Sequence, residues 1–271
     1  EARASYEALG YPCFEDHSLA VRAMAALRYF GEVFKKEETA SPTAIGEKPV
    51  LTKGQRISEF EAKKIFSTAG MQITLETLAK SSDEAIGFWK KIKKPVVLKI
   101  SSPDLQHKTD IGGVILDLDD ERDIQESFDK LSELGKANSI KNDIEGILVS
   151  EMVDNGVETV LGVVNDPVFG PTVMFGLGGV FVEVLKDVSF RVAPFDVKEA
   201  RMMIDEIRGR AILDGVRGAP PSDIEALAES LSQLSLFAIT NAENLGSVDL
   251  NPLIVLPKGT KIVDALIITI N

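Results

Sequence analysis

Apolar residues recur along this chain with two different periods, and this alternation predicts helices interspersed with strands. Helical spacing follows a polar residue that can cap the first turn at several places. The capping pairs, separated by three residues, are Ser58 with Glu61, Ser81 with Glu84, Asp196 with Glu199, and Ser222 with Glu225. A further helix is predicted over residues 120–136, where Ile124, Phe128 and Leu131 share one face.

Short runs rich in β-branched residues lie between these helices and predict strands. The runs are residues 71–76, 95–101, 113–119, 146–153, 158–166, 172–175, 181–194, 248–256 and 261–270. Several follow one another closely enough to pair as antiparallel neighbours. Strands that alternate with capped helices and include adjacent antiparallel pairs indicate an α+β or mixed α/β fold.

The first 36 residues form a separate segment. Leu19, Met24, Leu27 and Phe30 lie near one stripe of a predicted helix, with Asp16 or Ser18 as its N-cap. Because a single helix cannot bury its own apolar face, we interpret this segment as the end of something larger. Residues 37–56 are dominated by charge, Thr, Ser, Pro and Gly without periodicity, which is typical of a linker.

Charge and composition narrow the possible partners. The chain of 271 residues carries 30 Lys and Arg against 42 Asp and Glu, a formal charge of −12 that disfavours nucleic acid or an anionic membrane as partner. No apolar stretch approaches the roughly 20 residues needed to span a bilayer, and no signal pattern opens the sequence, so we expect a cytoplasmic protein. The lone Cys13 is expected to be an inert thiol, and His17 to be structural or exposed.

Two features could bind a phosphate, although each has a plain structural explanation. Lys99 ends an apolar strand, where a ligand commonly sits at a sheet edge, but a lone lysine there can simply extend to solvent. Gly176, Gly178 and Gly179 would let the backbone approach an anion closely. They match neither the Walker A loop nor G-x-G-x-x-G, and a tight turn explains them equally well.

The last two predicted strands can form a metal site. A two-residue loop at Lys258 and Gly259 would place Asn251 and Asp264 as diagonal neighbours on one face, about 7–8 Å apart, with Asp249 on that face too. Oxygen ligands held in this way suit Mg²⁺, which leaves its other positions to water and phosphate. The alternative is a solvated polar face.

His107 lies in the polar stretch DLQHKTDIGG, residues 104–113. It is either a surface histidine balanced by Asp110 or a nucleophile that accepts a phosphoryl group. In the second case Lys108 and backbone N–H groups would offset the added charge, and Gly112 and Gly113 would let the loop move.

Several long motifs in one order indicate a family. They are PVVLKISSPDLQHKTDIGGV, VETVLGVVNDPVFGPTVMFGLGGVFVEVLKDVSFRVAP, GVRG and VDLNPLIV. Together they resemble the ATP-grasp domain of NDP-forming acyl-CoA synthetases, over residues 57–271. The resemblance implies two α+β lobes with the nucleotide between them, residues 81–150 forming approximately the smaller lid. Residues 1–36 resemble the end of the CoA-ligase domain that precedes this domain in fused members.

The resemblance also implies a reaction: acyl-CoA + ADP + phosphate ⇌ acid + ATP + CoA, an acid–CoA ligase activity. His107 would carry the phosphoryl group, with Asp249 and Arg191 assisting. ATP or ADP would contact Lys99, Glu151, Met152, Val153, Glu158, Gly178 and Gly179, while Asn251 and Asp264 would hold Mg²⁺. The partner would be a CoA-ligase domain or subunit that carries the CoA and acyl sites, in an oligomeric enzyme.

Two other functions stay open. The chain could be a non-catalytic regulatory or scaffold domain of a synthetase-like protein acetyltransferase, although the joint presence of His107, Lys99, Asn251 and Asp264 argues against lost chemistry. It could also be an ATP-grasp ligase for another acid, although ligases that use an acyl-phosphate directly need no carrier histidine. The sequence leaves the identity of the acid, the choice of adenine or guanine and the oligomeric state open.

Overall fold

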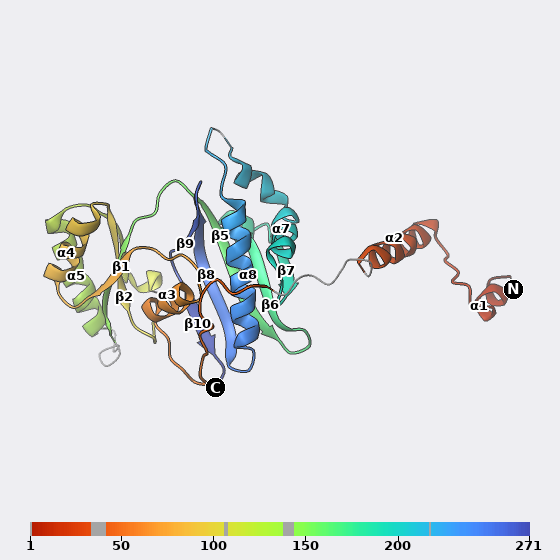
Figure 1. The fold of residues 1–271 in the computed structure, drawn as a ribbon, viewed down its shortest axis with the longest axis horizontal. Helices are drawn as coiled ribbons and strands as arrows, with labels where there is room; N and C mark the ends of the chain where they lie inside the picture. The colour runs from red at the N-terminus through yellow and green to blue at the C-terminus, as the bar shows by residue number, and fades with distance from the viewer. Residues whose placement is uncertain (1, 34–41, 106–107, 138–143, 217) are drawn as a thin grey trace. The chain divides into compact units, whose positions relative to one another are not determined.

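The chain contains two compact units, Glu1–Ala40 and Ser41–Asn271. The computed structural model describes residues 2–33, 42–105, 108–137, 144–216 and 218–271 (Figure 1). The first unit holds helices α1 (Ala2–Ala8) and α2 (His17–Val33). The backbone N–H of Ser18 donates to Oδ1 of Asp16 at 2.6 Å, which favours Asp16 over Ser18 as the residue that begins α2.

The smaller lobe of the second unit is a four-stranded antiparallel sheet in the order β1-β4-β2-β3, counted over the described residues. Its strands are β1 (Glu76–Ala79), β2 (Val96–Ser101), β3 (Val114–Leu118) and β4 (Gly146–Glu151). Helices α4 (Ser82–Ile92) and α5 (Glu121–Ala137) pack on this sheet (Figure 1). The sheet includes β1, so this lobe begins at Glu76, earlier than the expected residue 81.

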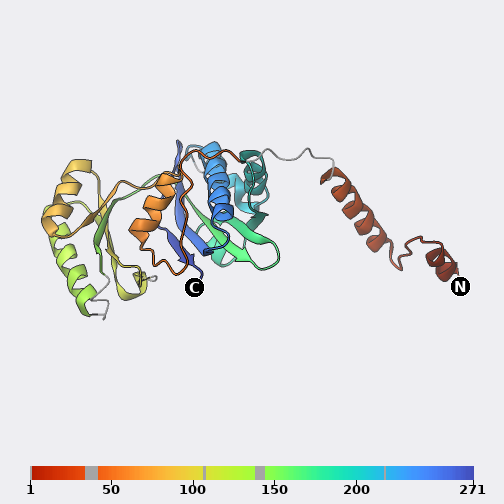
Figure 2. The ribbon, with the colours of Figure 1, turned by 60° about the horizontal axis from the view of Figure 1, so that its bottom comes forward.

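The larger lobe is built on a six-stranded sheet in the order β10-β8-β5-β6-β7, with β9 also paired to β8, again over the described residues. Its strands are β5 (Val157–Asp166), β6 (Gly170–Leu177), β7 (Val188–Val192), β8 (Leu245–Val255), β9 (Thr260–Ile262) and β10 (Leu266–Thr269). Helices α7 (Val197–Asp205) and α8 (Ile224–Thr240) cover one face (Figures 1 and 2). The predicted α+β class is confirmed, with antiparallel sheets in both lobes.

Helix α3 (Glu59–Thr68) precedes both sheets in sequence and packs on the core of the larger lobe. The ring of Phe66 meets that of Phe237 in α8 edge-on, with centroids 5.1 Å apart. The predicted capping box is confirmed, because the Ser58 hydroxyl accepts from the Glu61 N–H while the Glu61 carboxylate accepts from the Ser58 N–H. These two hydrogen bonds satisfy backbone N–H groups that the first turn of α3 would otherwise leave unpaired.

The other predicted caps have mixed outcomes. Ser81 and Asp196 each accept from a backbone N–H three residues later, as predicted. Ser222 does not cap α8; Asp223 does, through the N–H of Ala226. Asp223 also accepts from the N–H of Gly259 at 2.8 Å, so its carboxylate serves a helix start and a β-turn together, which a serine hydroxyl could not reach in the same way.

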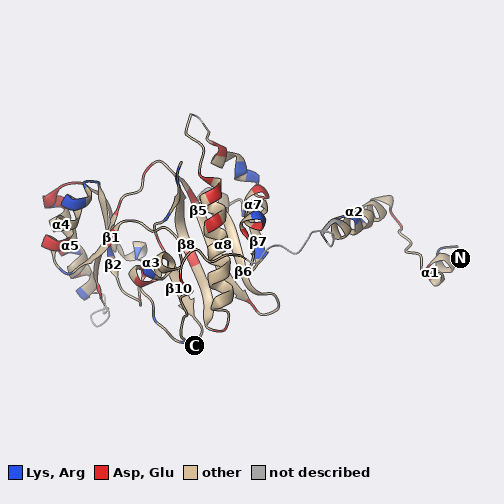
Figure 3. Cartoon of the chain, in the orientation of Figure 1, with Lys and Arg blue, Asp and Glu red and all other residues tan. Residues whose placement is uncertain are grey.

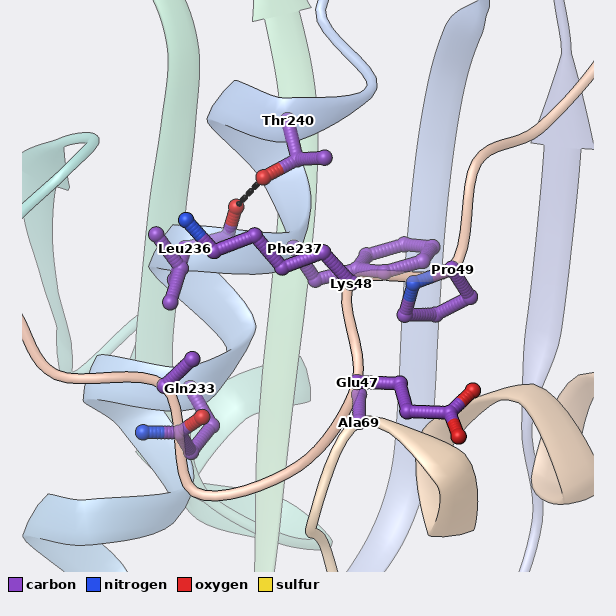
Figure 4. Close-up of a pocket in the computed structure, with 9 residues that line it drawn as sticks. Glu47, Lys48, Pro49, Ala69, Gln233, Leu236, Phe237 and Thr240 are labelled. Atoms are coloured by element: carbon purple, nitrogen blue, oxygen red, sulfur yellow. Dashed lines mark hydrogen bonds between the residues drawn. The ribbon is translucent and has the colours of Figure 1, made fainter.

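Residues 43–51 are packed against the larger lobe, although residues 37–56 were expected to be a linker. The side chain of Gln233 in α8 donates to Thr43 O and accepts from Ile45 N, and Asn241 accepts from Leu51 N at 2.6 Å. These amides replace the strand partners that the segment lacks. A cavity of about 10 Å³ lies there between Pro49 and Phe237 and could hold one water at most (Figure 4).

Three predicted strands differ from the structure. The run 261–270 is divided between β9 and β10, and residues 263–265 belong to neither strand. Residues 71–75 are irregular apart from a bridge between Ile73 and Ile262, and the strand starts only at Glu76. In residues 181–194 the first part forms the end of a short helix, α6 (Val180–Glu183), and only β7 is extended. Short 3₁₀ helices lie at Thr109–Ile111 and Arg208–Asp214.

No helix within the described ranges combines the length and the apolar character needed to cross a membrane.

Candidate active site

Lys99 lies buried where the smaller lobe meets the larger one. It belongs to β2, whose residues are all buried, and its side chain is 6% exposed. Its ammonium donates to Oε1 of Glu59 at 2.8 Å, to the carbonyl oxygen of Val263 at 3.2 Å and to Oδ2 of Asp264 at 3.2 Å. These three contacts match the three N–H donors of a lysine. Lys99 is therefore a paired internal cation, and the alternative of a lysine that reaches solvent is wrong.

Glu59 anchors a cluster of lysines around Lys99. Its carboxylate also contacts Nζ of Lys63 at 3.0 Å and Nζ of Lys108. Burial would raise the pKa of Glu59, but the three lysines outweigh burial and hold that pKa well below its usual range. Burial would likewise lower the pKa of Lys99, yet Glu59 and Asp264 raise it above its ordinary value. Both groups are charged at neutral pH.

Glu76 balances the remaining charge of this cluster. Its Oε2 lies 2.5 Å from Nζ of Lys63 and accepts from the hydroxyls of Thr74 and Ser150. Lys63 therefore has a carboxylate partner other than Glu59.

The hairpin of β8 and β9 brings the three expected metal-site residues to one place, by a different register from the predicted one. Its turn is centred on Pro257 and Lys258, since Leu256 N–H donates to Gly259 O at 3.0 Å. Leu253 pairs with Ile262. Asp249 pairs with Leu266 on the neighbouring strand.

Continuing this register places Asp264 directly opposite Asn251 rather than diagonal to it. The predicted register was wrong by two residues. Leu250 and Leu253 both belong to the core and the pairing with β5 shifts between them, so the strict alternation on which the prediction relied is interrupted there. Burial and the nearby Asp264 raise the pKa of Asp249. A bound cation would counteract that shift.

The donor set fits Mg²⁺. Two carboxylates and an amide oxygen are the hard ligands that this ion prefers, and it commonly takes one or two carboxylates and completes its shell with phosphate and water. Within the described ranges no group of three or more His, Cys, Asp or Glu could hold a metal ion without such help. We therefore assign Asn251 and Asp264, with Asp249 beside them, as residues that could hold Mg²⁺ together with a phosphate.

Glu151, Met152 and Val153 line a cavity of about 300 Å³ between the lobes, together with Pro95 and Lys261. The Glu151 carboxylate contacts Lys261 of β9, lies 2.9 Å from Lys94 Nζ and accepts from Leu75 N–H at 2.9 Å. Burial would raise the pKa of Glu151, but the Leu75 amide and the two lysines hold it below its ordinary value. Its side chain therefore connects the end of β4 to β9, beside a cavity whose size is typical of a ligand site.

Glu158 and the glycine turn are brought together at the start of β5. Gly178 N–H donates to Glu158 O at 2.8 Å, and a Cβ on Gly178 would stand 3.0 Å from Cβ of Glu158. Gly179 has φ of +62°, which favours glycine. Glu158 is exposed and lies on the same sheet face as Gly162, the partner of Asp249, four residues or about 13 Å further along β5.

Arg191 lies on the opposite face of the sheet. It pairs with Val173, a core residue beneath the helices. Its guanidinium bonds Glu199 at 2.6 Å and both oxygens of Glu206. Hydrogen bonds that Arg191 donates to Glu206 raise the pKa of Arg191 despite burial, with Glu199 adding to this. The structure does not bring Arg191 to the phosphate-binding group, because alternation along β7 turns it toward the helices.

His107 lies outside the described residues, whereas Lys108 is described and buried. Sequence analysis missed Glu59, Lys63 and Glu76, which have no motif. The only signal was charge at positions 59 and 63 in an otherwise half-apolar helix, separated by one helical turn.

In Figure 3 the ribbons of α4, α5 and α7 carry both basic and acidic positions.

Comparisons with known proteins agree with this arrangement. The family model of the ATP-grasp domain matches residues 50–269. An ADP-forming acetate–CoA ligase I of Archaeoglobus fulgidus is 39% identical over 265 residues, which cover 94% of this chain and 38% of that enzyme. The beta subunit of an ADP-forming acetate–CoA ligase II of Pyrococcus furiosus is 39% identical over 222 residues, covering 81% of this chain and 94% of the subunit.

Solved structures give the same result. The dinucleotide-forming acetyl-coenzyme A synthetase 1 of Ca. Korarchaeum cryptofilum, in complex with coenzyme A, Ca-AMPCP and HgCl⁺, superposes with a TM-score of 0.74 at 47% identity. The match covers 80% of this chain and 94% of that one. The chain thus spans little more than a third of the fused ligase and nearly all of the separate subunits it matches. By sequence and by fold, the chain belongs to the ATP-grasp domain family.

Proposed function

We propose that this chain is the nucleotide-binding part of an ADP-forming acyl-CoA synthetase. It binds ADP or ATP with Mg²⁺ between its lobes and transfers a phosphoryl group between His107 and the nucleotide. The complete reaction is acyl-CoA + ADP + phosphate ⇌ acid + ATP + CoA. The relatives at 39% identity that are named ADP-forming acetate–CoA ligases support this proposal.

One observation carries the proposal: the buried ammonium of Lys99 is 3.2 Å from Asp264, on the side of the site where Asn251 and Asp249 gather. A cation and a set of hard oxygen ligands in one place are what a nucleotide polyphosphate with its metal ion requires. A scaffold domain has no physical need to bury a lysine beside three such ligands, because burial of a charge is costly.

The residues have separate roles in the transfer. Lys99 neutralises charge on the nucleotide phosphates, and Mg²⁺, when bound, would neutralise further charge on the transferring group. Glu158 and the glycine turn would bind the ribose end, and Met152 and Val153 would flank the base. The phosphorus–nitrogen bond of phosphorylated His107 breaks as an oxygen of the ADP β-phosphate bonds to phosphorus, and the electron pair of the broken bond returns to the imidazole.

A CoA-ligase domain or subunit would supply the CoA and acyl sites. Helix α2 offers a reason to expect one, since the side chains of its apolar stripe are all exposed: Leu19 at 49%, Met24 at 69%, Leu27 at 71% and Phe30 at 53%. A helix with such a stripe is stabilised mainly by packing against another surface. The match to the A. fulgidus ligase covers 94% of this chain and only 38% of that enzyme, whereas the match to the beta subunit covers 81% of this chain, which supports a larger enzyme in which this chain is one part.

The proposal is tested by incubating the purified chain with γ-labelled ATP and Mg²⁺ and following acid-labile, base-stable label. We expect label in the wild type and none in His107→Ala. Asp264→Asn should lower the affinity for Mg²⁺·ADP in calorimetry, while the affinity measured with excess EDTA should not fall, because Lys99 no longer has to release a carboxylate to reach a phosphate. Val168→Ala, an exposed change on the distant β5–β6 turn, serves as control.

If the wild type binds Mg²⁺·ADP but takes up no label, the CoA-ligase partner of the P. furiosus type is added and the assay repeated. Absence of both binding and label with the partner present would contradict the proposal and favour a scaffold role.

A further inference from the structure

The two oxygens of Glu59 hold lysines that come from different parts of the smaller lobe. Oε1 accepts from Lys99 of β2 at 2.8 Å, and Oε2 contacts Nζ of Lys108, which follows residue 107 directly in the chain. Glu59 itself belongs to α3, which packs on the core of the larger lobe through Phe66. One carboxylate from the larger lobe thus joins two cations of the smaller one.

We infer that Glu59 is a positioning residue: it docks the end of the loop that follows residue 107 beside the phosphate-binding Lys99. The inference rests on the proposed function, in which Lys99 contacts the nucleotide phosphates and the residue before Lys108 carries the phosphoryl group. Glu59 acts through the two lysines and does not itself touch the reacting atoms.

The burial of Lys108 indicates that this contact does more than fill the core. A lysine in a polar loop can keep its ammonium in water at little cost, whereas Lys108 is 8% exposed. Burying it removes hydration and side-chain freedom, and the ion pair with Glu59 offsets this loss. The contact with Glu59 therefore holds this end of the loop in place, although Lys108 gives up its hydration to make it.

Charge balance points the same way. Lys63 has Glu76 as a second carboxylate partner, at 2.5 Å, so Glu59 is not its sole counter-ion. Lys99 keeps Asp264 only until a metal ion engages that carboxylate. When it does, Glu59 remains to hold Lys99, and the third N–H of Lys99 can turn to a phosphate.

The backbone near Lys108 is tied to β2 as well. Gly113 N–H donates to Lys108 O at 2.7 Å, and Gly113 O accepts from Ile100 N–H at 3.0 Å. A Cβ on Gly113 would stand 2.9 Å from Lys108 O, so only glycine allows this approach. The side chain of Lys108 and the following turn therefore dock together on the residue next to Lys99.

The test compares Glu59→Gln, Lys108→Met and the double variant in the full chain. Ser58→Ala is the matched control, because it weakens the start of the same helix without removing any group of the cluster. Hydrogen exchange of backbone amides in residues 108–118 measures docking directly. We expect exchange to accelerate about tenfold or more in each single variant and to stay within about twofold in the control. The amides of the double variant should exchange no faster than those of Glu59→Gln, since both changes break the same contact between Glu59 and Lys108.

Activity separates positioning from simple structural support. In Lys108→Met the rate of labelling by γ-labelled ATP should fall about tenfold, while the dissociation constant for Mg²⁺·ADP stays within about twofold. In Glu59→Gln the labelling rate should fall and the dissociation constant for Mg²⁺·ADP should rise, because Lys99 loses the carboxylate that orients its ammonium. If Glu59→Gln does not fold, Lys108→Met carries the test.

Unchanged exchange in Lys108→Met, or equal acceleration in Ser58→Ala, would overturn the inference. A labelling rate in Lys108→Met equal to that of the wild type would overturn it too. If the wild type neither binds Mg²⁺·ADP nor takes label, the proposed function fails and the role in phosphoryl transfer falls with it. The exchange data then still show whether Glu59 docks the loop end, so the two failures are distinguishable.

Discussion

Replacing Lys99 by methionine is expected to weaken ADP binding and to leave adenosine binding unchanged. The side chain of Lys99 is 6% exposed. Methionine is unbranched and apolar, so it can occupy much of the buried space that the aliphatic part of this side chain fills. The contact of the ammonium with phosphate is lost, together with its hydrogen bonds to Glu59, Val263 and Asp264. Adenosine has the base and ribose but no phosphate, and it therefore reports on everything except that contact.

The size of the effect follows from the partners of Lys99. A hydrogen bond between charged groups contributes about 1.5–3 kcal/mol. To reach a phosphate, Lys99 must release Asp264, whose side chain is 40% exposed, and such a partly solvated pair is worth about 0–1 kcal/mol. The difference, about 0.5–3 kcal/mol, corresponds to about a 2- to 160-fold rise in the dissociation constant for Mg²⁺·ADP.

Isothermal titration calorimetry of wild type and Lys99→Met with Mg²⁺·ADP and with adenosine measures both quantities. Thermal unfolding of the two proteins shows whether the variant is folded, which we expect because Glu59 keeps Lys63 and Lys108 as partners. An ADP affinity within twofold of wild type would refute the reasoning. An equal loss for adenosine would do so as well, since it would mean that the site as a whole had been deformed.

Three further changes test other parts of the structure. Asp223→Ala should destabilise the protein by about 0.5–2 kcal/mol at pH 7 in urea unfolding, because alanine cannot accept from the N–H groups of Ala226 and Gly259; these backbone amides lower the pKa of Asp223, so its contribution is complete above pH 3.8 and the gap between variant and wild type should narrow as pH falls below that value. Phe66→Ala should cost about 3–5 kcal/mol because Phe66 is fully buried, whereas Phe169→Ala, at an exposed site, should change stability by less than about 0.5 kcal/mol in the same assay. Gly178→Ala should displace Glu158 and weaken Mg²⁺·ADP binding several-fold in calorimetry with little change in melting temperature; unchanged binding would exclude Glu158 from the site.

The local features of the fold were predictable wherever a few neighbouring residues decide them. The capping box at Ser58 and Glu61 formed as predicted, because both of its hydrogen bonds lie within one helical turn. The N-cap of α8 was misplaced by one residue, since Asp223 also satisfies the distant N–H of Gly259. The hairpin of β8 and β9 has a register two residues away from the predicted one, because the register depends on the turn, and β8 breaks its alternation between Leu250 and Leu253 where its pairing with β5 shifts.

The candidate site divides in the same way. Lys99, Asn251 and Asp264 could be singled out from residue type and position in a strand. Arg191 had the right charge, but alternation along β7 and the carboxylates of Glu199 and Glu206 turn it to the helix-covered face.

By itself, then, the sequence determined the α+β class, most helix starts and the residue types of a phosphate and metal site, because periodicity, capping and ligand chemistry are local. Only the tertiary structure decided which charges meet. Lys99 and Lys108 lie 40 and 49 residues after Glu59 along the chain. Nothing in the sequence around these residues encodes their pairing with Glu59. A buried charge is stable only beside its counter-charge, so the packing of α3 against both lobes selects these partners.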